Sequence, residues 1–263
     1  MGKQTGLTAR IVLLVSLLLI VQGVIYFIAI IASGAELTGI LLFTGIVVLY
    51  HAALGAGLIA SKGLFVRDES GNTLSGIGTA NTLTLFRISS IPTLSWLFLS
   101  SGIGIGIVPL VFLAAVFTTD FLDGFLARAF KEVSKIGKYL DSVSDYLLLI
   151  AASIVFFLRQ IIPLWLFALI TARMVLVGLS VVMVSLLKKK AVYTISFLGK
   201  LAVFSTMTLF VLEIVPIVFT LPSFSTTILT VAEYTTGAIL GLSLVEKVVL
   251  VIRETASGPG NTR

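Results

Sequence analysis

Long apolar runs recur along this chain, and they constrain its fold more than any other feature. An α-helix rises about 1.5 Å per residue, so roughly 20 apolar residues cross the hydrocarbon core of a membrane. Hydrophobic residues make up 58% of the chain and charged residues only 11%, too few charges for a water-soluble surface. The sequence therefore predicts an all-α integral membrane protein in a lipid bilayer. We expect eight spans, at residues 11–33, 37–60, 84–101, 105–127, 138–158, 162–187, 196–219 and 234–252.

Basic residues gather in alternate loops and predict the orientation of these spans. Lys62 and Arg67 follow the second span, and Lys188, Lys189 and Lys190 follow the sixth, whereas the intervening loops hold almost none. Because positive loops stay in the cytoplasm, both termini and the loop between the fourth and fifth spans are expected there. The net charge of +6 is explained by these loops and by anionic lipids, so no nucleic-acid partner is predicted. We expect a multi-pass protein of a bacterial or archaeal cytoplasmic membrane.

A polar segment divides the chain unequally. Residues 61–83 are rich in Gly, Ser and Asn and predict a cytoplasmic loop with a short interfacial helix. Residues 1–60 then form two N-terminal transmembrane helices, for which the sequence indicates no role. The first of these helices is too long for a signal peptide and is expected to stay as an anchor. Residues 84–252 form a six-span domain, and residues 253–263 a flexible cytoplasmic tail.

Four of the chain's five aspartates lie within one short window, Asp120 to Asp145. Asp120 and Asp123 are three residues apart at the end of the fourth span, and Asp141 and Asp145 are four apart in the fifth. These spacings place each pair on one helix face. The short connection makes the two helices antiparallel neighbours, so the acidic faces are expected to meet near the cytoplasmic interface.

Such a cluster needs compensation, because a carboxylate inside a membrane costs about 2.5–3.5 kcal/mol and neighbouring carboxylates repel. Carboxylates without His or Cys suit a hard divalent ion such as Mg²⁺ or Mn²⁺, which also binds substrate phosphates. The small residues Gly124, Ala127 and Gly137 leave room for a large ligand to approach the backbone.

The window also carries a family resemblance. It reads D-x2-D-G-x2-A-R-x8-G-x3-D-x3-D and resembles the signature of the CDP-alcohol phosphotransferases. The eight fixed positions are filled by Asp120, Asp123, Gly124, Ala127, Arg128, Gly137, Asp141 and Asp145. The resemblance extends over roughly residues 80–250 and implies the six-helix core of that family, with the first two helices as additions.

The resemblance implies transfer of a phosphatidyl-type group from CDP-diacylglycerol to a small alcohol, with release of CMP. By motif position, two divalent ions would be held by Asp120, Asp123, Asp141 and Asp145, and Asp145 would also be the general base. The CDP donor would be bound by Gly124, Ala127, Arg128, Gly137, Asn81 and Thr84.

Basic residues within the apolar spans favour a phosphorylated acceptor. The stretch NTLTLFR resembles the PN-x2-T-x2-R element of phosphatidylglycerophosphate synthases, with Ala80 in place of the proline. The acceptor phosphate would then be bound by Arg87, Arg173, Lys200 and Lys138. Glycerol 3-phosphate is the leading acceptor, and an inositol phosphate, inositol, serine or a choline-type alcohol stays open.

A cation-coupled transporter is the alternative from another functional class, because it too would carry carboxylates within a membrane.

His51, the single histidine, lies in the second span and is expected to be packed or to face a pore. The small residues Gly237 and Gly241 predict close helix packing, either within the chain or in a homodimer.

Overall fold

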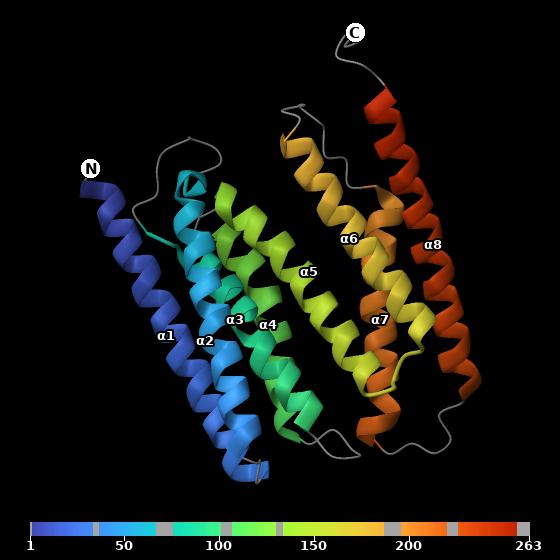
Figure 1. Ribbon diagram of the computed structural model, residues 1–263, viewed down its shortest axis with the longest axis horizontal. Helices are drawn as coiled ribbons and strands as arrows, with labels where there is room; N and C mark the ends of the chain where they lie inside the picture. Colours follow the sequence, from blue (N-terminus) through green and yellow to red (C-terminus); the bar gives the residue numbers. More distant parts are fainter. Residues whose placement is uncertain are drawn as a thin grey trace. The chain divides into compact units, whose positions relative to one another are not determined.

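The structure, a computed structural model, describes residues 2–33, 37–66, 76–100, 107–129, 134–186, 196–219 and 226–256. This part of the chain is helical (Figure 1). The elements are α1 (Gly2–Ser33), α2 (Leu37–Ala60), the short 3-10 helix η1 (Lys62–Leu64), α3 (Thr79–Ser100), α4 (Ile107–Ala129), α5 (Lys135–Leu158), α6 (Leu164–Leu186), α7 (Phe197–Phe219) and α8 (Thr226–Ala256).

The protein is an all-α, multi-pass integral membrane protein, as the apolar runs predict. Seven helices, α1 to α5, α7 and α8, are long and apolar enough to cross a membrane. Helix α6 has 23 residues, and the side chains of only its first part, Leu164–Gly178, belong to the described residues. Two helices begin before the expected spans 11–33 and 234–252. Helix α1 starts at Gly2 and its apolar span at Gly6, and the apolar span of α8 starts with the helix, at Thr226.

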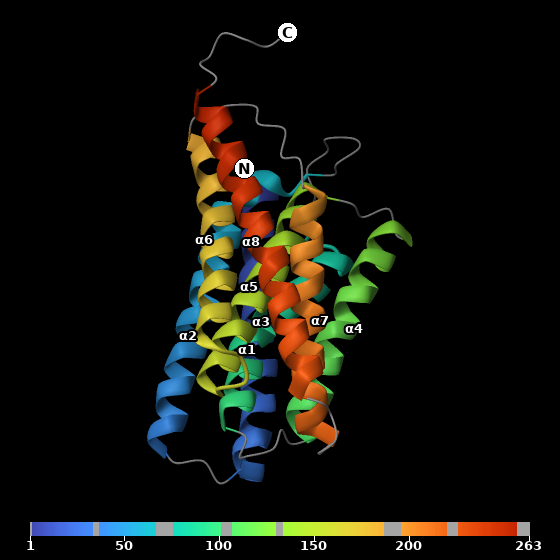
Figure 2. The ribbon, with the colours of Figure 1, turned by 90° about the vertical axis from the view of Figure 1, so that its right-hand side faces the viewer.

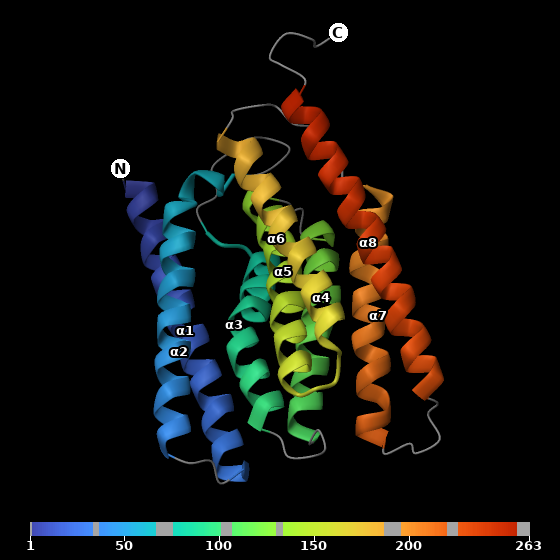
Figure 3. The ribbon, with the colours of Figure 1, turned by 45° about the vertical axis from the view of Figure 1, so that its right-hand side comes forward.

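The chain divides into two compact units, residues Met1–Ala151 and Ala152–Arg263. In the first unit, α1 and α2 lie side by side and pack on α3, which also packs on α4 (Figures 1 and 3). Helix α3 is the most enclosed: 67% of its span is buried, against 17% for α2. A helix shielded from lipid by its neighbours can carry polar side chains, and α3 is indeed the least apolar of the seven spans.

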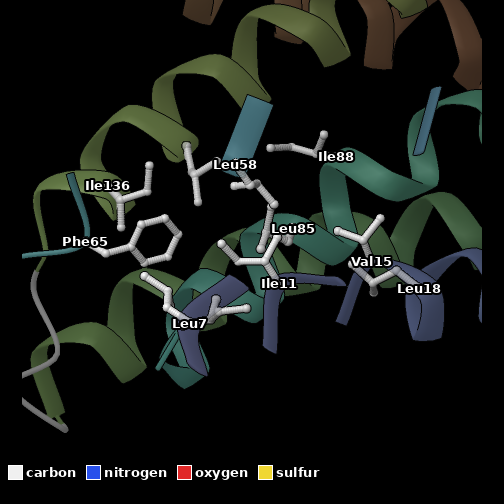
Figure 4. Close-up of a cluster of buried hydrophobic side chains, with 11 residues drawn as sticks. Leu7, Ile11, Val15, Leu18, Leu58, Phe65, Leu85, Ile88 and Ile136 are labelled. Carbon is white, nitrogen blue, oxygen red and sulfur yellow. The ribbon is translucent and has the colours of Figure 1, made fainter. Parts of the chain in front are cut away.

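The apolar core of the first unit joins the N-terminal helix to α3 and to α5, which carries two of the motif aspartates (Figure 4). One face of α1 supplies side chains at spacings of three and four residues, which is the period of a helix face. They pack against side chains of α2, α3 and α5 and against Phe65, which follows η1. The buried members are Leu7, Ile11, Val15, Leu18, Leu58, Phe65, Ile77, Leu85, Ile88, Ile136 and Leu140.

In the second unit, α8 packs against both α6 and α7 (Figure 2). The indole ring of Trp165 on α6 stacks on Tyr234 of α8, with ring centroids 5.3 Å apart. A Cβ atom at Gly237 would lie 2.6 Å from this indole ring, whereas a Cβ at Gly241 would meet nothing within 4 Å. The absence of a side chain at Gly237 therefore allows α8 to pack closely against Trp165 of α6.

This contact yields a prediction for stability. We expect Gly237→Val to lower the free energy of unfolding by about 1–3 kcal/mol, because the added side chain must displace the stacked indole ring. Thermal unfolding of the purified protein in detergent measures the change. Gly241→Val is the matched control and is expected to keep the wild-type Tm; equal Tm values for the two variants would contradict the packing role of Gly237.

Candidate active site

Three carboxylates from two helices converge on one arginine in the first unit. Arg87 lies on α3 and its side chain is 1% exposed. Its Nη2 atom is 3.0 Å from Asp141 Oδ1, 3.6 Å from Asp123 Oδ2 and 3.9 Å from Asp145 Oδ1. Asp123 comes from α4, and Asp141 and Asp145 come from α5. The expected meeting of the two acidic faces is thus observed for these three side chains, with a guanidinium between them that the spacing alone did not predict.

Two hydroxyl groups fix this arrangement. Thr84, one turn before Arg87 on α3, donates its hydroxyl hydrogen to Asp123 Oδ2 at 2.8 Å. Arg87 Nε donates to Ser144 Oγ at 2.6 Å. Ser144 was not among the predicted site residues. Its spacing three residues after Asp141 is the signal that could have found it, because it places Ser144 on the acidic face of α5.

The first turn of α5 is braced by α3. Ser134, just before α5, accepts a hydrogen bond from the Gly137 backbone N–H at 3.1 Å, as an N-cap residue does. Asn81 Nδ2 donates to Ser134 Oγ at 3.2 Å and to the Ile77 carbonyl at 2.6 Å. A Cβ atom at Gly137 would lie 2.5 Å from Asn81 Oδ1. The motif glycine is therefore needed at this position for the close approach of the Asn81 side chain.

The carboxylates differ in their access to the surroundings. The Asp123 side chain is only 8% exposed, whereas Asp141 is 56% and Asp145 39% exposed. The two acids of α5 can therefore meet a ligand while Asp123 is enclosed by Thr84 and Arg87. The side chains of three further predicted site residues, Asp120, Ala127 and Arg128, lie outside the described residues.

The donor set has the chemistry of a site for a hard cation. Carboxylate oxygens are the ligands that Mg²⁺ and Mn²⁺ prefer. Three of them lie within 3.9 Å of one point, which the positively charged Nη2 atom of Arg87 occupies. Among the described side chains, no group of three acidic or histidine residues is arranged to hold an ion as it stands. A divalent ion at this point would replace the guanidinium as the partner of the carboxylates.

A second arginine forms a polar network within the second unit. Arg173 of α6 is 3% exposed; its Nη2 donates to the Gly199 carbonyl at 2.8 Å and its Nε to Ser243 Oγ at 3.1 Å. Ser196 accepts from the Gly199 backbone N–H at 3.0 Å and donates to Glu246 Oε2 at 2.7 Å. Ser196, Ser243 and Glu246 were not among the predicted site residues. The S-x-x-G spacing of Ser196 and Gly199, which repeats that of Ser134 and Gly137, could have indicated one of them.

The four predicted acceptor-binding cations thus have different surroundings. Arg87 contacts the carboxylates, and Arg173 is buried against the start of α7. Lys138 on α5 and Lys200 on α7 are exposed. The carbonyl that Arg173 binds belongs to Gly199, the residue before Lys200.

Comparison with known proteins assigns the family. The model of the CDP-alcohol phosphatidyltransferase family matches residues 77–245, which include the whole aspartate motif. The chain belongs to the CDP-alcohol phosphatidyltransferase family. The predicted extent of the resemblance is thereby confirmed, and α1 and α2 lie outside the matched region.

Several curated relatives share part of the chain. A CMP-forming cardiolipin synthase of Streptomyces coelicolor is 34% identical over 133 residues, covering 48% of this chain and 60% of that protein. A CDP-diacylglycerol–glycerol-3-phosphate 3-phosphatidyltransferase of Bacillus subtilis is 32% identical over 105 residues, covering 35% of this chain and 54% of that protein. The chain thus spans little more than half the length of these relatives. No solved structure matches the chain.

The contacts of Arg87 predict the effect of removing its charge. We expect Arg87→Gln to lower the free energy of unfolding by about 3 kcal/mol, because it leaves three neighbouring carboxylates without their counter-charge. Mn²⁺ should raise the Tm of this variant more than that of the wild type, since the cation can then bind without displacing a guanidinium. Thermal unfolding in detergent with and without Mn²⁺ measures both effects.

Arg159→Gln is the control for a general loss of positive charge. Arg159 directly follows α5, at the end of that helix away from Asp141. If both variants lose the same stability and respond alike to Mn²⁺, Arg87 does not serve as the counter-charge of the aspartates.

Proposed function

We propose that this protein transfers a phosphatidyl group from CDP-diacylglycerol to an alcohol, with glycerol 3-phosphate as the leading acceptor and CMP as the second product. The observation that carries the proposal is the convergence of Asp123, Asp141 and Asp145 on one point between α3, α4 and α5. These residues occupy motif positions of a family defined by this class of transfer. The family match also favours the transferase over a cation-coupled transporter.

Asp145 is the proposed general base. It is the farthest of the three carboxylates from the guanidinium, and its side chain is partly exposed, so it can approach an acceptor hydroxyl. The hydroxyl oxygen forms a bond to the phosphorus next to diacylglycerol while its proton passes to Asp145. The bond from that phosphorus to the oxygen bridging to CMP breaks, and CMP leaves with the bonding electron pair. Reaction of donor and alcohol thus gives the phospholipid, CMP and one proton.

The family generally depends on divalent metal, and we propose Mg²⁺ or Mn²⁺, as two ions, for this protein. Asp120, Asp123, Asp141 and Asp145 would hold them, and the ions would supply positive charge to the diphosphate and to the departing phosphate. Thr84 keeps Asp123 oriented toward the two acids of α5. The enclosed setting of Asp123 and Arg87 keeps water away from one side of this centre.

The remaining site residues are assigned by their motif positions. Gly124, Ala127 and Arg128 would border the CDP moiety, and Asn81 and Gly137 would shape its place by holding the first turn of α5 against α3. The acceptor phosphate would be bound by the cations Arg87, Lys138, Arg173 and Lys200. Of these, Lys138 and Lys200 are exposed.

The distribution of basic loops supports an orientation. We place both termini and the aspartate centre on the cytoplasmic side of a bacterial or archaeal membrane. A hydrophilic CDP group and apolar acyl chains can meet at such an interface. Association into a homodimer stays a prediction. Of the two small residues that suggested close helix packing, Gly237 and Gly241, Gly237 packs against Trp165 within the chain.

A second acceptor has a specific observation in its favour. The relative from Streptomyces coelicolor is named a CMP-forming cardiolipin synthase and matches a larger share of this chain than the relative from Bacillus subtilis does. Forming cardiolipin with loss of CMP requires CDP-diacylglycerol as donor and phosphatidylglycerol as acceptor. Both candidate acceptors present a glycerol hydroxyl and a phosphate, so the same centre could serve either.

A transfer assay separates these possibilities. Purified protein in detergent is given radiolabelled CDP-diacylglycerol, Mg²⁺ or Mn²⁺, and one acceptor at a time: glycerol 3-phosphate, phosphatidylglycerol, an inositol phosphate, inositol, serine or choline. We expect metal-dependent release of CMP and a labelled phosphatidylglycerophosphate. Labelled cardiolipin would instead assign phosphatidylglycerol as the acceptor, and absence of CMP release with every alcohol would refute the transferase.

Two carboxylate variants test the assigned roles. We expect Asp123→Asn and Asp145→Asn each to lower the rate of CMP release at least about 100-fold, because one loses a charged ligand and the other the base. Ser142→Ala is the control on the same helix as Asp145: its exposed hydroxyl bonds only to the Lys138 carbonyl in the described contacts. Near-wild-type turnover in either aspartate variant would contradict its assignment.

A further inference from the structure

The helices α1 and α2 place two buried polar side chains and one half-buried one against the rest of the first unit. Gln22 of α1 is 0% exposed and His51 of α2 is 1% exposed, and Tyr50 lies beside His51. Polar groups at such depth are costly unless they are hydrogen-bonded. The family match begins at residue 77, so it does not account for these side chains.

All three side chains bind consecutive residues of α3. The Tyr50 hydroxyl donates to the Ile88 carbonyl at 2.9 Å. His51 Nε2 lies 2.7 Å from Ser89 Oγ. Gln22 Nε2 donates to Ser90 Oγ at 3.0 Å. These contacts begin at the residue directly after Arg87, so they fix the segment of α3 that carries the guanidinium.

The orientation of the His51 ring is itself fixed. Its Nδ1 lies 2.8 Å from the Val47 carbonyl, one turn earlier on α2. A carbonyl can only accept, so Nδ1 carries the hydrogen and Nε2 of the neutral ring accepts from the Ser89 hydroxyl. The ring therefore couples the backbone of α2 to α3 through two directional bonds.

A second connection reaches the start of α5. Phe65, directly after η1, is 2% exposed and packs in the cluster that contains Ile136 and Leu140 of α5 (Figure 4). The neighbouring Val66 carbonyl accepts a hydrogen bond from the Lys135 backbone N–H at 3.1 Å. The chain leaving α2 thus holds the first turn of the helix that carries Asp141 and Asp145.

We propose that the hairpin of α1 and α2 is a positioning element for the aspartate centre, with Gln22, Tyr50 and His51 as positioning residues that act through α3. It fixes α3, which supplies Arg87 and Thr84, and the start of α5, which supplies two carboxylates. The hairpin thereby sets the separation between Asp123 and the acids of α5. The part of this inference that concerns turnover rests on the proposed function.

A matched pair of variants tests the inference. Tyr50→Phe removes a hydroxyl that binds α3, whereas Tyr26→Phe removes one that binds the Ile40 carbonyl within the hairpin. His51→Leu is a stronger second variant. For each full-length protein in detergent, the measurements are Tm, kcat for CMP release, and the Mn²⁺ dissociation constant by calorimetry.

We expect Tyr50→Phe to lower kcat and to raise the Mn²⁺ dissociation constant, each about three- to tenfold, because Asp123 shifts away from the acids of α5. His51→Leu should exceed this effect, and Tyr26→Phe should stay within twofold of wild type. If Tyr50→Phe and His51→Leu change only Tm, or match Tyr26→Phe throughout, the hairpin is a structural anchor and the inference is wrong. Should wild type release no CMP, the proposed function fails, while the Mn²⁺ titrations still decide whether the hairpin positions the carboxylates.

Discussion

The contact of one buried guanidinium with three carboxylates is the interaction on which the rest of this structure depends. Three like charges could not share a small space at the edge of an apolar core without a counter-charge. Arg87 supplies it from a side chain that is 1% exposed, and the acids of α5 remain partly open. The charge of the three carboxylates is therefore only partly offset from the protein side, and the acids of α5 are accessible from the other, which suits a centre that receives a phosphate-bearing ligand with its cations.

The packing around α3 explains how this charge cluster is tolerated. Helix α3 has the lowest hydropathy of the described spans and the largest buried share. The helices α1 and α2 separate it from lipid on one side and offer polar partners to its serines, while α4 covers another side. A helix that would be poorly stable in lipid is thus the central element of the first unit. Its polar residues form hydrogen bonds with neighbouring helices.

Sequence reasoning predicted the membrane class, the order of the helices and the meeting of the aspartates, because each follows from a period or a length. Apolar runs define spans, and spacings of three or four residues define helix faces. It did not predict that Arg87 lies among the carboxylates, since these contacts join side chains far apart in the sequence, 54 residues in the case of Asp141. The close contact of Asn81 with Gly137 could not be predicted for the same reason. The motif showed that residue 137 is small, but not that the Asn81 side chain occupies the space beside it.

The N-terminal helices illustrate the same limit from the other side. Their apolar runs predicted two spans and no role, because a single histidine and a single glutamine in apolar sequence carry no spacing signal. Only the three-dimensional contacts show that Gln22, Tyr50 and His51 reach successive residues of α3. The role proposed for these helices therefore follows from contacts between helices and not from any local sequence pattern.

The position of a bound cation would show whether the three carboxylates form the metal site. Anomalous diffraction from crystals grown with Mn²⁺ and a CDP-lipid would give the position of the metal. We expect Mn²⁺ among Asp123, Asp141 and Asp145, with the Arg87 guanidinium moved from the point it occupies here. A diphosphate and its Mn²⁺ bound elsewhere, with Arg87 still joined to the three carboxylates, would contradict it.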